Sequence, residues 1–583
     1  MNHFEQAAKL YSRGLIECPN TEDVLLATIF ANRSAALYHM KEYHRSLEDM
    51  DLSLSLPYPK NLKYKIQDRR ARCYLALNDL SHALEIFKKT MSALEESNLT
   101  AENRLKKEAD VAVMIAMLTK TLSETKAQKK YPNVKSELPP VPNLSGNRNK
   151  KYPSASNLVH FTEAPGEGRF AVAERNIDPG EILVVEKAYC ASLLYEQSKS
   201  HCQECFVRVR YPIPCPNCPN VVFCSIKCRM HALNTYHKYE CKFLGSLWTS
   251  GCSIVCSLAI RLITQKGLQY FLDVKPNLSQ NLNENTKYDP SSYKTIYNLC
   301  RHKDQRSHVD FFQRTVMATV LLRFLQETGF FKSEISKKLT DNEIYIGGLL
   351  LHNLQVLQFN AHEVAELQFD SDYPGELDRA KSQFIGGGLF PTLALFNHSC
   401  EPGIVRYFSG LKVIVRSVKS IESGNIIAEN YGPIYTQTPK EVRKAELKTQ
   451  YWFDCNCTPC TENWPLFDDM NTAILPFKCI NGGCLGMVKV NTNTDEFMFP
   501  CPKCAESICI FGSLKSLNDT EALFNRGEKL LKNQLFKEAL DVFIKIMKIL
   551  DNVLKPPYKD FCLCQQKIRS LINNYGTGID TDL

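Results

Sequence analysis

Residues 202–241 read CQECFVRVRYPIPCPNCPNVVFCSIKCRMHALNTYHKYEC, and the spacing of cysteine and histidine in this stretch constrains how the surrounding chain folds. Cysteine thiolates and histidine nitrogens are preferred zinc ligands, and a pair of them two or three residues apart can grip one ion from a tight turn. Two such pairs complete a tetrahedral shell, so the stretch predicts two zinc ions. Spacing alone leaves open whether His231 or His237 joins the second ion. The cysteine ligands are Cys202, Cys205, Cys215, Cys218, Cys224, Cys228 and Cys241.

Two further cysteine clusters lie downstream. The first contains Cys455, Cys457 and Cys460, and because a closed zinc site needs four ligands, a fourth must come from elsewhere in the chain. The second joins two close pairs across residues 487–499, a stretch expected to form a β-hairpin, in the pattern of a zinc ribbon. Zinc whose four positions are all filled by protein groups is structural rather than catalytic. The ribbon ligands are Cys479, Cys484, Cys501 and Cys504.

Length and composition exclude several classes of protein. The chain has 583 residues, of which 44% are apolar and 23% charged, so it holds several folded domains and is not a disordered chain. Glu5, Lys9 and Arg13 interrupt the apolar core that a secretory leader would need, and no apolar run reaches the roughly 20 residues of a membrane span. The 24 cysteines therefore indicate metal ligands in a reducing compartment rather than disulfides. Counting ligand cysteines as thiolates and adding four divalent ions lowers the formal net charge from +8 to about +1, so the basic character largely disappears.

Two stretches near the N-terminus repeat each other. Residues 31–50 superpose without gaps on residues 68–87, a period of 37, with small and large side chains coinciding as in stacked helical hairpins. The pattern resembles tetratricopeptide repeats, and residues 4–18 look like the second helix of a preceding unit. Residues 524–543 keep the same spacing, which predicts a second helical domain toward the C-terminus.

A central region of short strands is expected between the two helical ends. Residues 168–190 alternate apolar and polar side chains around an Asp-Pro-Gly turn, and residues 411–427 repeat that style, which predicts a compact β core with helices on it. Residues 126–152 are rich in Pro, Asn and Lys and predict a flexible basic linker. The fold class is therefore multi-domain α+β.

Four short motifs follow one another through the central region. They are Gly166-Glu167-Gly168, Asn397-His398-Ser399-Cys400-Glu401-Pro402, Glu429-Asn430-Tyr431-Gly432 and the stretch RKAELKTQYWFDCNCTPC at residues 443–460. Their order, with the metal-binding stretch before them and the cysteine trio after them, resembles the SET domain of protein-lysine methyltransferases split by a MYND finger. This is the arrangement of the SET and MYND domain-containing family. The resemblance covers nearly the whole chain and extends to the tetratricopeptide-bearing member of that family.

The resemblance implies how the chain is divided and how its metals are shared. The β core is a split SET domain, and Cys400 matches the fourth ligand of the zinc held by the cysteine trio. In a MYND finger alternate pairs share an ion, which selects His237 and places Cys202, Cys205, Cys224 and Cys228 on one zinc and Cys215, Cys218, His237 and Cys241 on the other. The implied segments are tetratricopeptide-like helical repeats at 1–125, a linker at 126–152, the N-terminal part of SET at 153–200, the MYND finger at 201–241, the SET insertion and core at 242–440, a post-SET segment at 441–465, a four-cysteine zinc-ribbon-like element at 466–510 and a C-terminal helical repeat domain at 511–583.

The resemblance also implies a cofactor and a reaction, transfer of a methyl group from S-adenosylmethionine to lysine side chains of histone or non-histone proteins. Tyr431 is the expected catalytic tyrosine and Tyr451 is expected to line the lysine channel. Such a transfer mainly needs alignment, and an aromatic channel lowers the pKa of the substrate ammonium by desolvating it, so that the lysine reacts neutral. The expected cofactor contacts are Gly166, Glu167, Gly168, Asn360, Asn397, His398, Tyr431 and Phe453.

Two positions depart from the family pattern. Gly403 stands where asparagine is common, and Glu167 places a negative charge close to where the cofactor carboxylate is expected. These departures motivate an alternative function, a weakly active or inactive SET scaffold that recruits other proteins through its MYND and tetratricopeptide surfaces.

The expected partners are proteins. Besides lysine-containing substrates, they are repressor complexes and chaperone C-terminal tails, for which Asn32, Lys65 and Arg69 supply part of a carboxylate clamp. We expect the protein in the cytoplasm and nucleus, without membrane attachment. Direct nucleic-acid binding is not expected, because no basic helix with base-reading residues stands out.

Overall fold

The computed structural model divides the chain into two compact units. The first comprises residues 1–137 and 195–250, and the second residues 138–194 and 251–583. The structure describes residues 2–18, 22–124, 138–278, 286–331, 338–370, 372–373, 375–576 and 578–579. Every helix within these ranges is too short or too polar to cross a bilayer.

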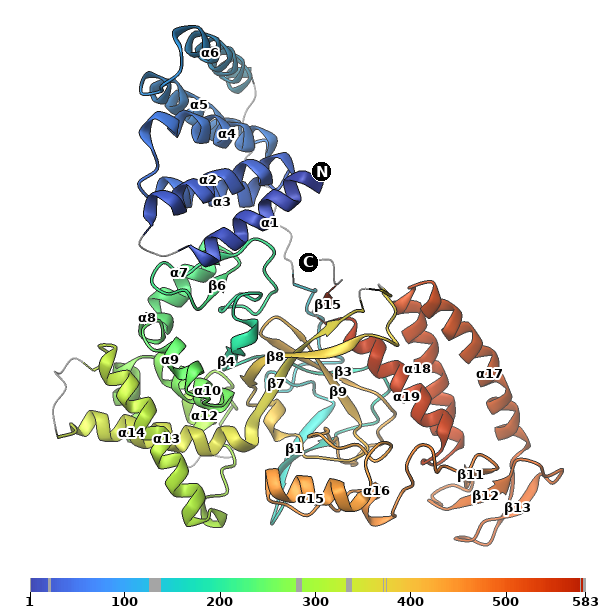
Figure 1. Ribbon diagram of the computed structural model, residues 1–583. Coiled ribbons are helices and arrows are strands. Elements are labelled where there is room, and N and C mark those ends of the chain that lie inside the picture. The colour runs from blue at the N-terminus through green and yellow to red at the C-terminus, as the bar shows by residue number, and fades with distance from the viewer. Residues whose placement is uncertain are drawn as a thin grey trace. The chain divides into compact units, whose positions relative to one another are not determined.

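A stack of helices begins the first unit (Figure 1), and each helix packs on the next along the chain. The close approach of α2 to α3 follows from small side chains, since the Ser46 hydroxyl donates to the Ser34 carbonyl oxygen at 2.8 Å. The expected helical hairpins are present, whereas their assignment to the tetratricopeptide class stays a prediction. The helices are α1 (Asn2–Glu17), α2 (Asp23–His39), α3 (Tyr43–Leu54), α4 (Lys63–Ala76), α5 (Leu80–Glu95) and α6 (Ala101–Glu124).

The cysteine-rich stretch belongs to the same unit and shares a core with these helices. Ile213 is buried in one apolar cluster with Leu15, Leu26 and Phe30. Tyr211, two residues earlier, is buried against helices α1 and α2 in a second cluster. The separate segments expected at 1–125 and 201–241 therefore fold as one body. Its further elements are β5 (Ile213–Pro214), β6 (Val222–Phe223), α7 (Ile226–Asn234), α8 (His237–Glu240) and α9 (Leu244–Thr249).

A buried arginine ties the two parts of this unit together. The Arg33 side chain is 1% exposed and donates to both carboxylate oxygens of Asp49, from Nε at 2.8 Å and from Nη2 at 2.7 Å. Its remaining nitrogen, Nη1, donates to the Pro212 carbonyl oxygen at 2.9 Å. Arg33 therefore links α2 and α3 to the metal-binding stretch.

The arginine of the expected carboxylate clamp is also used internally. Arg69 Nη1 donates to the Ala31 carbonyl oxygen at 3.0 Å and to the Ser34 hydroxyl at 2.8 Å, while Asn32 and Lys65 are exposed. These bonds hold α4 against α2 through one guanidinium nitrogen, and the expected carboxylate clamp stays a prediction.

The second unit is built on small antiparallel sheets. Strands β1 and β2 form a hairpin, a three-stranded sheet has the order β3-β10-β9, and a four-stranded sheet has the order β15-β7-β8-β4. Among the named strands of these sheets, every described pairing is antiparallel except that of β15 with β7. The strands are β1 (Val159–Ala164), β2 (Gly168–Ala173), β3 (Ile182–Lys187), β4 (Cys190–Leu193), β7 (Ala361–Gln368), β8 (Lys381–Leu389), β9 (Ile404–Ser409), β10 (Lys412–Ser417) and β15 (Gly578–Ile579).

Part of the expected linker is instead hydrogen-bonded to this β core. Ser145 N–H donates to the Ile182 carbonyl oxygen at 2.9 Å, and the Asn149 amide donates to the Val159 carbonyl oxygen at 2.7 Å. The prediction of a flexible linker is wrong for these residues, because a polar stretch can satisfy its groups against a strand edge as well as against water. Residues 126–137 of the expected linker lie outside the described residues.

Helices fill the part of the second unit that lies between the metal-binding stretch and β7 in sequence. The longest two, α13 and α14, pack on each other, and α14 begins with a capping box in which Thr340 and Glu343 satisfy each other's backbone. Because α14 runs directly into β7, it sets the position of that strand. The helices are α10 (Ile254–Thr264), α11 (Leu268–Val274), α12 (Tyr293–Tyr297), α13 (His308–Glu327) and α14 (Asp341–Asn360).

The C-terminal part carries the ribbon and a helical bundle. The hairpin expected at residues 487–499 is not formed, because β12 pairs with the preceding β11 and β13 with the following β14. The final helices pack in sequence, as expected from the spacing in 524–543. The elements are α15 (Lys440–Tyr451), α16 (Thr458–Thr461), β11 (Ile474–Lys478), β12 (Met487–Asn491), β13 (Met498–Pro500), β14 (Ser507–Cys509), α17 (Phe511–Lys532), α18 (Phe536–Val553) and α19 (Lys559–Asn573).

Candidate functional site

Two of the four motifs, at residues 396–400 and 428–435, lie side by side in the second unit, and this place is called the crossing below. His398 and Glu429 form a parallel bridge, in which Ser399 N–H donates to the Glu429 carbonyl oxygen at 2.7 Å and Glu429 N–H donates to the Asn397 carbonyl oxygen at 2.9 Å. The Asn430 side chain adds a bond to the Ser399 carbonyl oxygen at 3.2 Å. Segments 31 residues apart in sequence are thereby held side by side.

Both the backbone and the side chain of Tyr431 form hydrogen bonds at this crossing. Its backbone N–H donates to His398 Nδ1 at 3.0 Å, and its hydroxyl donates to the Phe396 carbonyl oxygen at 2.7 Å. Burial raises the pKa of Tyr431 well above its ordinary value, with the nearby Tyr451 adding to the shift. The phenol is therefore a neutral hydrogen-bonding group at any physiological pH.

Aromatic rings gather around Tyr431 from the end of α15. The rings of Tyr431 and Tyr451 lie 4.9 Å apart, and Phe453 lies 6.5 Å from Tyr431 and 6.0 Å from His398. Trp452 has a left-handed backbone (φ 63°), which ends the helix and turns the chain between Tyr451 and Phe453. The structure thus brings the expected Tyr431, Tyr451, Phe453 and His398 into one aromatic cluster.

A pocket of about 460 Å³ opens at the turn between β1 and β2. Gly166 and Gly168 adopt φ values of +81° and +66°, which glycine tolerates without strain, and both have open space where a Cβ would stand. Asn397 Nδ2 donates to the Glu167 carbonyl oxygen at 3.1 Å, which joins the crossing to this turn. The lining residues are Glu163, Ala164, Pro165, Gly166, Gly168, His302 and Gln305.

Glu167 does not place its charge in this pocket. Its exposed side chain is not among the lining residues, and only its backbone carbonyl joins the site. Sequence reasoning missed His302 and Gln305, because they come from an insertion without a motif and become neighbours of the glycine turn only in the folded chain.

Asn360 has a different place from the one expected. Its side-chain amide donates to the Cys300 and Val356 carbonyl oxygens, both at 2.7 Å, and the residue is 4% exposed. It does not line the pocket. It fixes the chain at Cys300, two residues before His302, and so supports the pocket wall.

Gly403, the other departure from the pattern, fits the crossing. Its N–H donates to the Ala428 carbonyl oxygen at 3.0 Å, and a Cβ at this position would lie 2.9 Å from Ile421 Cδ1. The packing at this end of the crossing is therefore built around glycine, and asparagine would require Ile421 to move.

A buried ionic group lies behind the crossing and was not foreseen. The Arg406 guanidinium contacts the Glu429 carboxylate, and His362 Nε2 lies 3.7 Å from the same carboxylate. Burial, together with the charge of Arg406, lowers the pKa of His362 to about 3, so this imidazole is neutral. These residues come from β7, β9 and the Glu429 motif, whose proximity is set by the fold and not by sequence spacing.

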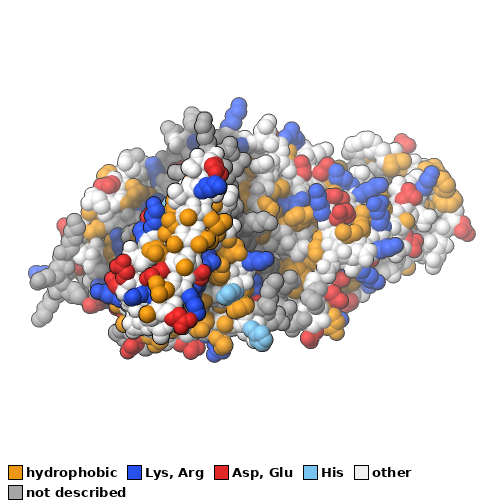
Figure 2. Space-filling view, turned by 90° about the horizontal axis from the view of Figure 1, so that it is seen from above, with side chains coloured by type: hydrophobic (Ala, Val, Ile, Leu, Met, Phe, Trp, Pro, Cys, Tyr) orange, Lys and Arg blue, Asp and Glu red, His pale blue; other side chains and the backbone are white. Residues whose placement is uncertain are grey.

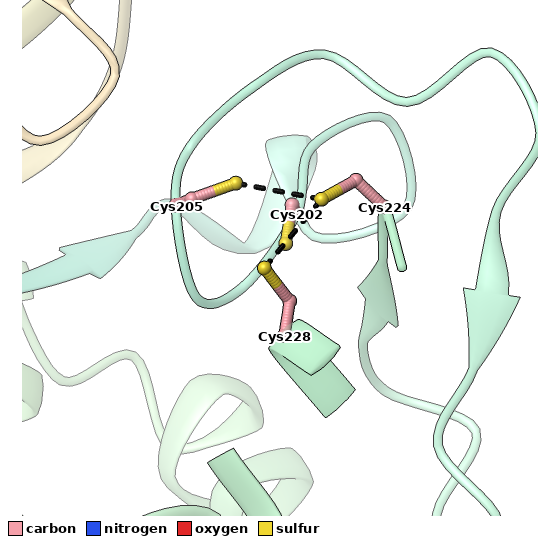
Figure 3. Close-up of side chains that lie close together, drawn as sticks. All are labelled: Cys202, Cys205, Cys224 and Cys228. Atoms are coloured by element: carbon pink, nitrogen blue, oxygen red, sulfur yellow. Dashed lines mark hydrogen bonds between the residues drawn. The ribbon is translucent and has the colours of Figure 1, made fainter. Parts of the chain in front are cut away.

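Four groups of cysteine and histidine have the geometry of zinc sites. In a tetrahedral site with zinc–sulfur bonds of about 2.3 Å, two sulfur atoms lie about 3.8 Å apart. In the group drawn in Figure 3, Cys224 Sγ lies 3.6 Å from both Cys205 Sγ and Cys228 Sγ. The groups are Cys202, Cys205, Cys224 and Cys228; Cys215, Cys218, His237 and Cys241; Cys400, Cys455, Cys457 and Cys460; and Cys479, Cys484, Cys501 and Cys504.

The structure places His237, not His231, with the second cysteine pair. His237 is fully buried and its Nε2 lies 3.5 Å from Cys218 Sγ. The His231 side chain is 61% exposed and lies 2.9 Å from a Glu204 oxygen. A soft, buried donor set of three thiols and one imidazole suits zinc.

Cys400 joins the cysteine trio to the crossing. Its sulfur lies 3.9 Å from Cys455 Sγ and 3.6 Å from Cys460 Sγ, close to the spacing of a tetrahedral zinc site. Cys400 also ends the segment that begins at Asn397. A zinc ion in this group would connect the crossing to the segment that carries Tyr451 and Phe453.

The ribbon group differs in how it is built. Cys479 and Cys484 lie in the turn between β11 and β12, and Cys501 and Cys504 in the turn between β13 and β14. Each hairpin therefore contributes one knuckle, instead of a single hairpin joining both. Sulfur separations of 3.8 Å between Cys479 and Cys504 and between Cys484 and Cys501 match the spacing for zinc.

Comparison with known proteins agrees with this geometry. The MYND finger family matches residues 202–241. The chain is 26% identical to the protein-lysine N-methyltransferase SMYD4 of Mus musculus over 94% of the chain and 76% of that protein, and 26% identical to SMYD4 of Homo sapiens over 78% of the chain and 64% of that protein. It is 25% identical to the N-lysine methyltransferase SMYD2 of Gallus gallus over 54% of the chain and 62% of that protein.

Proposed function

Starting from the membership of this chain in the SET and MYND domain-containing family, we propose that it transfers a methyl group from S-adenosylmethionine to lysine side chains of proteins. The observation that carries the proposal is the crossing of residues 396–400 with residues 428–435. Asn397 connects the crossing to the glycine turn on one side. On the other side, Tyr431 lies against the aromatic residues at the end of α15.

The pocket at the glycine turn supports a cofactor of this size. Its volume of about 460 Å³ lies within the usual range for small-molecule sites, and the open space at Gly166 and Gly168 lets a ligand approach the backbone. Gly166, Gly168 and the newly recognised His302 and Gln305 line this pocket and would hold S-adenosylmethionine. Asn397, His398 and Phe453 are not among its lining residues and would complete the cofactor site from beside it. When bound, this cofactor supplies an electrophilic methyl group.

The residues around Tyr431 fit the needs of the substrate lysine. Methyl transfer to an amine requires alignment at near-attack distance more than a strong base in the transition state. Tyr431 and Tyr451 offer aromatic faces that tolerate a methylammonium product and exclude water, and desolvation lowers the pKa of the incoming lysine ammonium. A neutral Tyr431 orients the amine through its hydroxyl oxygen.

The proposed zinc ions act on structure and not on chemistry. All four groups offer four protein ligands each, which leaves no position open for a reacting water. The group at Cys400 has the most direct effect on the reaction, because it connects the Asn397–Cys400 segment to the segment after α15.

Titration calorimetry and a methylation assay test the proposal together. Purified protein is titrated with S-adenosylmethionine, and transfer of radiolabelled methyl groups into lysate proteins is compared for the parent, Tyr431→Phe and the exposed control Tyr195→Phe. We expect cofactor binding in all three and loss of transfer only in Tyr431→Phe. Absence of binding in the parent contradicts the enzyme function and favours the scaffold alternative. Full transfer by Tyr431→Phe contradicts the role of this tyrosine.

A further inference from the structure

Helix α6, the last of the N-terminal stack, carries an apolar stripe on its outer face. Leu105, Val113 and Met117 are 64%, 58% and 60% exposed, and Ala109 and Ala116 between them are also exposed. Residues at this three- or four-residue spacing share one side of a helix. Figure 2, which looks down on this end of the stack, shows apolar side chains gathered along the helix with charged side chains beside them.

The opposite face of α6 is already used. Val111 and Leu118 are buried against α5, and Met114 and Ile115 pack around them. An array of helical hairpins is soluble as a single copy when its terminal helix has a polar outer face. Helix α6 has two apolar faces, so within the described residues its outer face is not the polar face that ends such an array.

The outer stripe is complementary to itself. Along the helix, Leu105 and Met117 are equidistant from position 111, as are Ala109 and Val113. Glu102 and Lys120 are equidistant from the same position, and both lie on the outer side. Two copies of α6 in antiparallel orientation therefore place Leu105 at the level of Met117 and Ala109 at the level of Val113. They also place Ala116 at the level of Lys106, and each Glu102, which accepts a hydrogen bond from Lys106 of its own helix at 2.7 Å, at the level of a Lys120.

We propose that α6 is a homodimerisation surface, on which the α6 helix of a second copy of this chain packs in antiparallel orientation. A parallel pair would place like charges at the same level, whereas the antiparallel pair places opposite charges there and aligns the two helix dipoles favourably. A two-fold interface of this kind uses the same patch on both copies, so one self-complementary stripe suffices.

The size of the stripe predicts a weak, reversible dimer. A helix of 24 residues is about 36 Å long, and the face of one such helix lies at the low end of specific interfaces, below about 1,200 Å² in total. We therefore expect monomer and dimer to exchange with protein concentration rather than a permanent dimer.

Sedimentation velocity of the full chain over a range of concentrations tests this surface. Val113→Gln/Met117→Gln removes four apolar side chains per dimer and is expected to weaken association by at least about tenfold. Val316→Gln, an exposed valine on α13, is the control and should associate like the parent. Circular dichroism and melting temperature establish that each variant is folded. A parent that stays monomeric at about 100 µM overturns the proposal, and so does a dimer that the double variant leaves unchanged.

Charge reversal tests the orientation independently. Glu102→Lys and Lys120→Glu each place two like-charge pairs in an antiparallel homodimer, so each variant alone should associate more weakly by roughly threefold or more. A mixture of the two restores both opposite-charge pairs and should form a heterodimer at least as readily as the parent dimerises. Mixing that fails to recover association contradicts the antiparallel arrangement.

Discussion

The hydroxyl of Tyr451 donates a hydrogen bond to the backbone carbonyl oxygen of Tyr431 at 3.2 Å. One aromatic residue of the proposed lysine channel thus positions the backbone of the other. Since the Tyr431 hydroxyl and backbone N–H are also bonded, to Phe396 and His398, this tyrosine is held at each polar group that it offers.

Tyr451→Phe is expected to lower methyl transfer more than cofactor binding. The substitution keeps the aromatic wall and removes one bond worth about 0.5–1.5 kcal/mol, so we expect turnover to fall roughly tenfold through misplacement of Tyr431. Single-turnover kinetics measure the transfer step, and calorimetry measures cofactor affinity. An equal loss in both would contradict a positioning role and indicate that Tyr451 contributes to the cofactor site.

Cys400→Ser is expected to remove one zinc ion per chain and weaken cofactor binding together. Loss of one ligand from a four-ligand site frees the segment that begins at Asn397 from the segment after α15. Metal content by inductively coupled plasma mass spectrometry should fall from four to three ions. Cys509→Ser, an exposed cysteine outside the four groups, is the control and should keep all of them. Unchanged metal content in Cys400→Ser would show that the trio finds its fourth ligand elsewhere.

Asn360→Ala is expected to weaken cofactor binding without touching the pocket. The Cys300 and Val356 carbonyl oxygens each lose one hydrogen bond, and such a bond contributes about 0.5–1.5 kcal/mol. The wall at His302 then loosens, so calorimetry should show lower affinity with a lower melting temperature. A variant with parental stability and lost affinity would instead support the direct cofactor contact expected from the sequence.

Local spacing was a reliable guide where the chemistry is local. The seven cysteines of residues 202–241 could be read as ligands from the sequence because each pair lies within one turn. Cys400 could not be found in this way, since 55 residues separate it from Cys455, and only the family resemblance suggested it. The wall residues His302 and Gln305 and the Arg406–Glu429 contact carry no pattern of their own, because they become neighbours only when the insertion and the strands pack.

The errors in the sequence-based fold have a similar origin. Residues 487–499 alternate like a hairpin, yet β12 and β13 each pair outward, with strands that enclose a cysteine pair. Residues 145–152 have a linker composition, yet their polar groups bond to the β core. In both cases contacts with residues far away in sequence decide the local structure, and the local composition does not predict those contacts.

A pH dependence of stability is expected from Glu186 on β3. Its buried carboxylate accepts hydrogen bonds from the backbone N–H of Thr392 at 2.9 Å and of Leu393 at 3.1 Å, just before the crossing segment, and burial raises its pKa from 4.5 to about 7. Between these two values the folded chain binds a proton that the unfolded chain lacks. The stability that this group contributes is therefore present at low pH and is lost as pH rises from about 4.5 to about 7.

Melting temperatures between pH 5 and pH 8 measure this dependence. Glu186→Gln should flatten the profile, and the exposed control Glu422→Gln should leave it unchanged. One proton contributes at most about 1.4 kcal/mol per pH unit, which sets the largest change in slope. An identical slope in Glu186→Gln and the parent would show that Glu186 is ionised throughout this range.

The buried pair of Arg33 and Asp49 should be the most sensitive point of the first unit. Arg33→Met removes the cation and leaves an uncompensated buried carboxylate, and breaking a buried pair in this way costs about 3–5 kcal/mol. It also removes the donor to the Pro212 carbonyl, so both the packing of α2 on α3 and the attachment of the metal-binding stretch to α1–α3 should loosen.

Arg33→Met/Asp49→Leu removes both charges and should recover much of the lost stability, because desolvating two charges offsets most of what the pair contributes. Hydrogen exchange over residues 206–214 and over α2 reports both effects. If the double variant exchanges as fast as Arg33→Met, the bond from Arg33 to Pro212, and not the ion pair, holds this unit together.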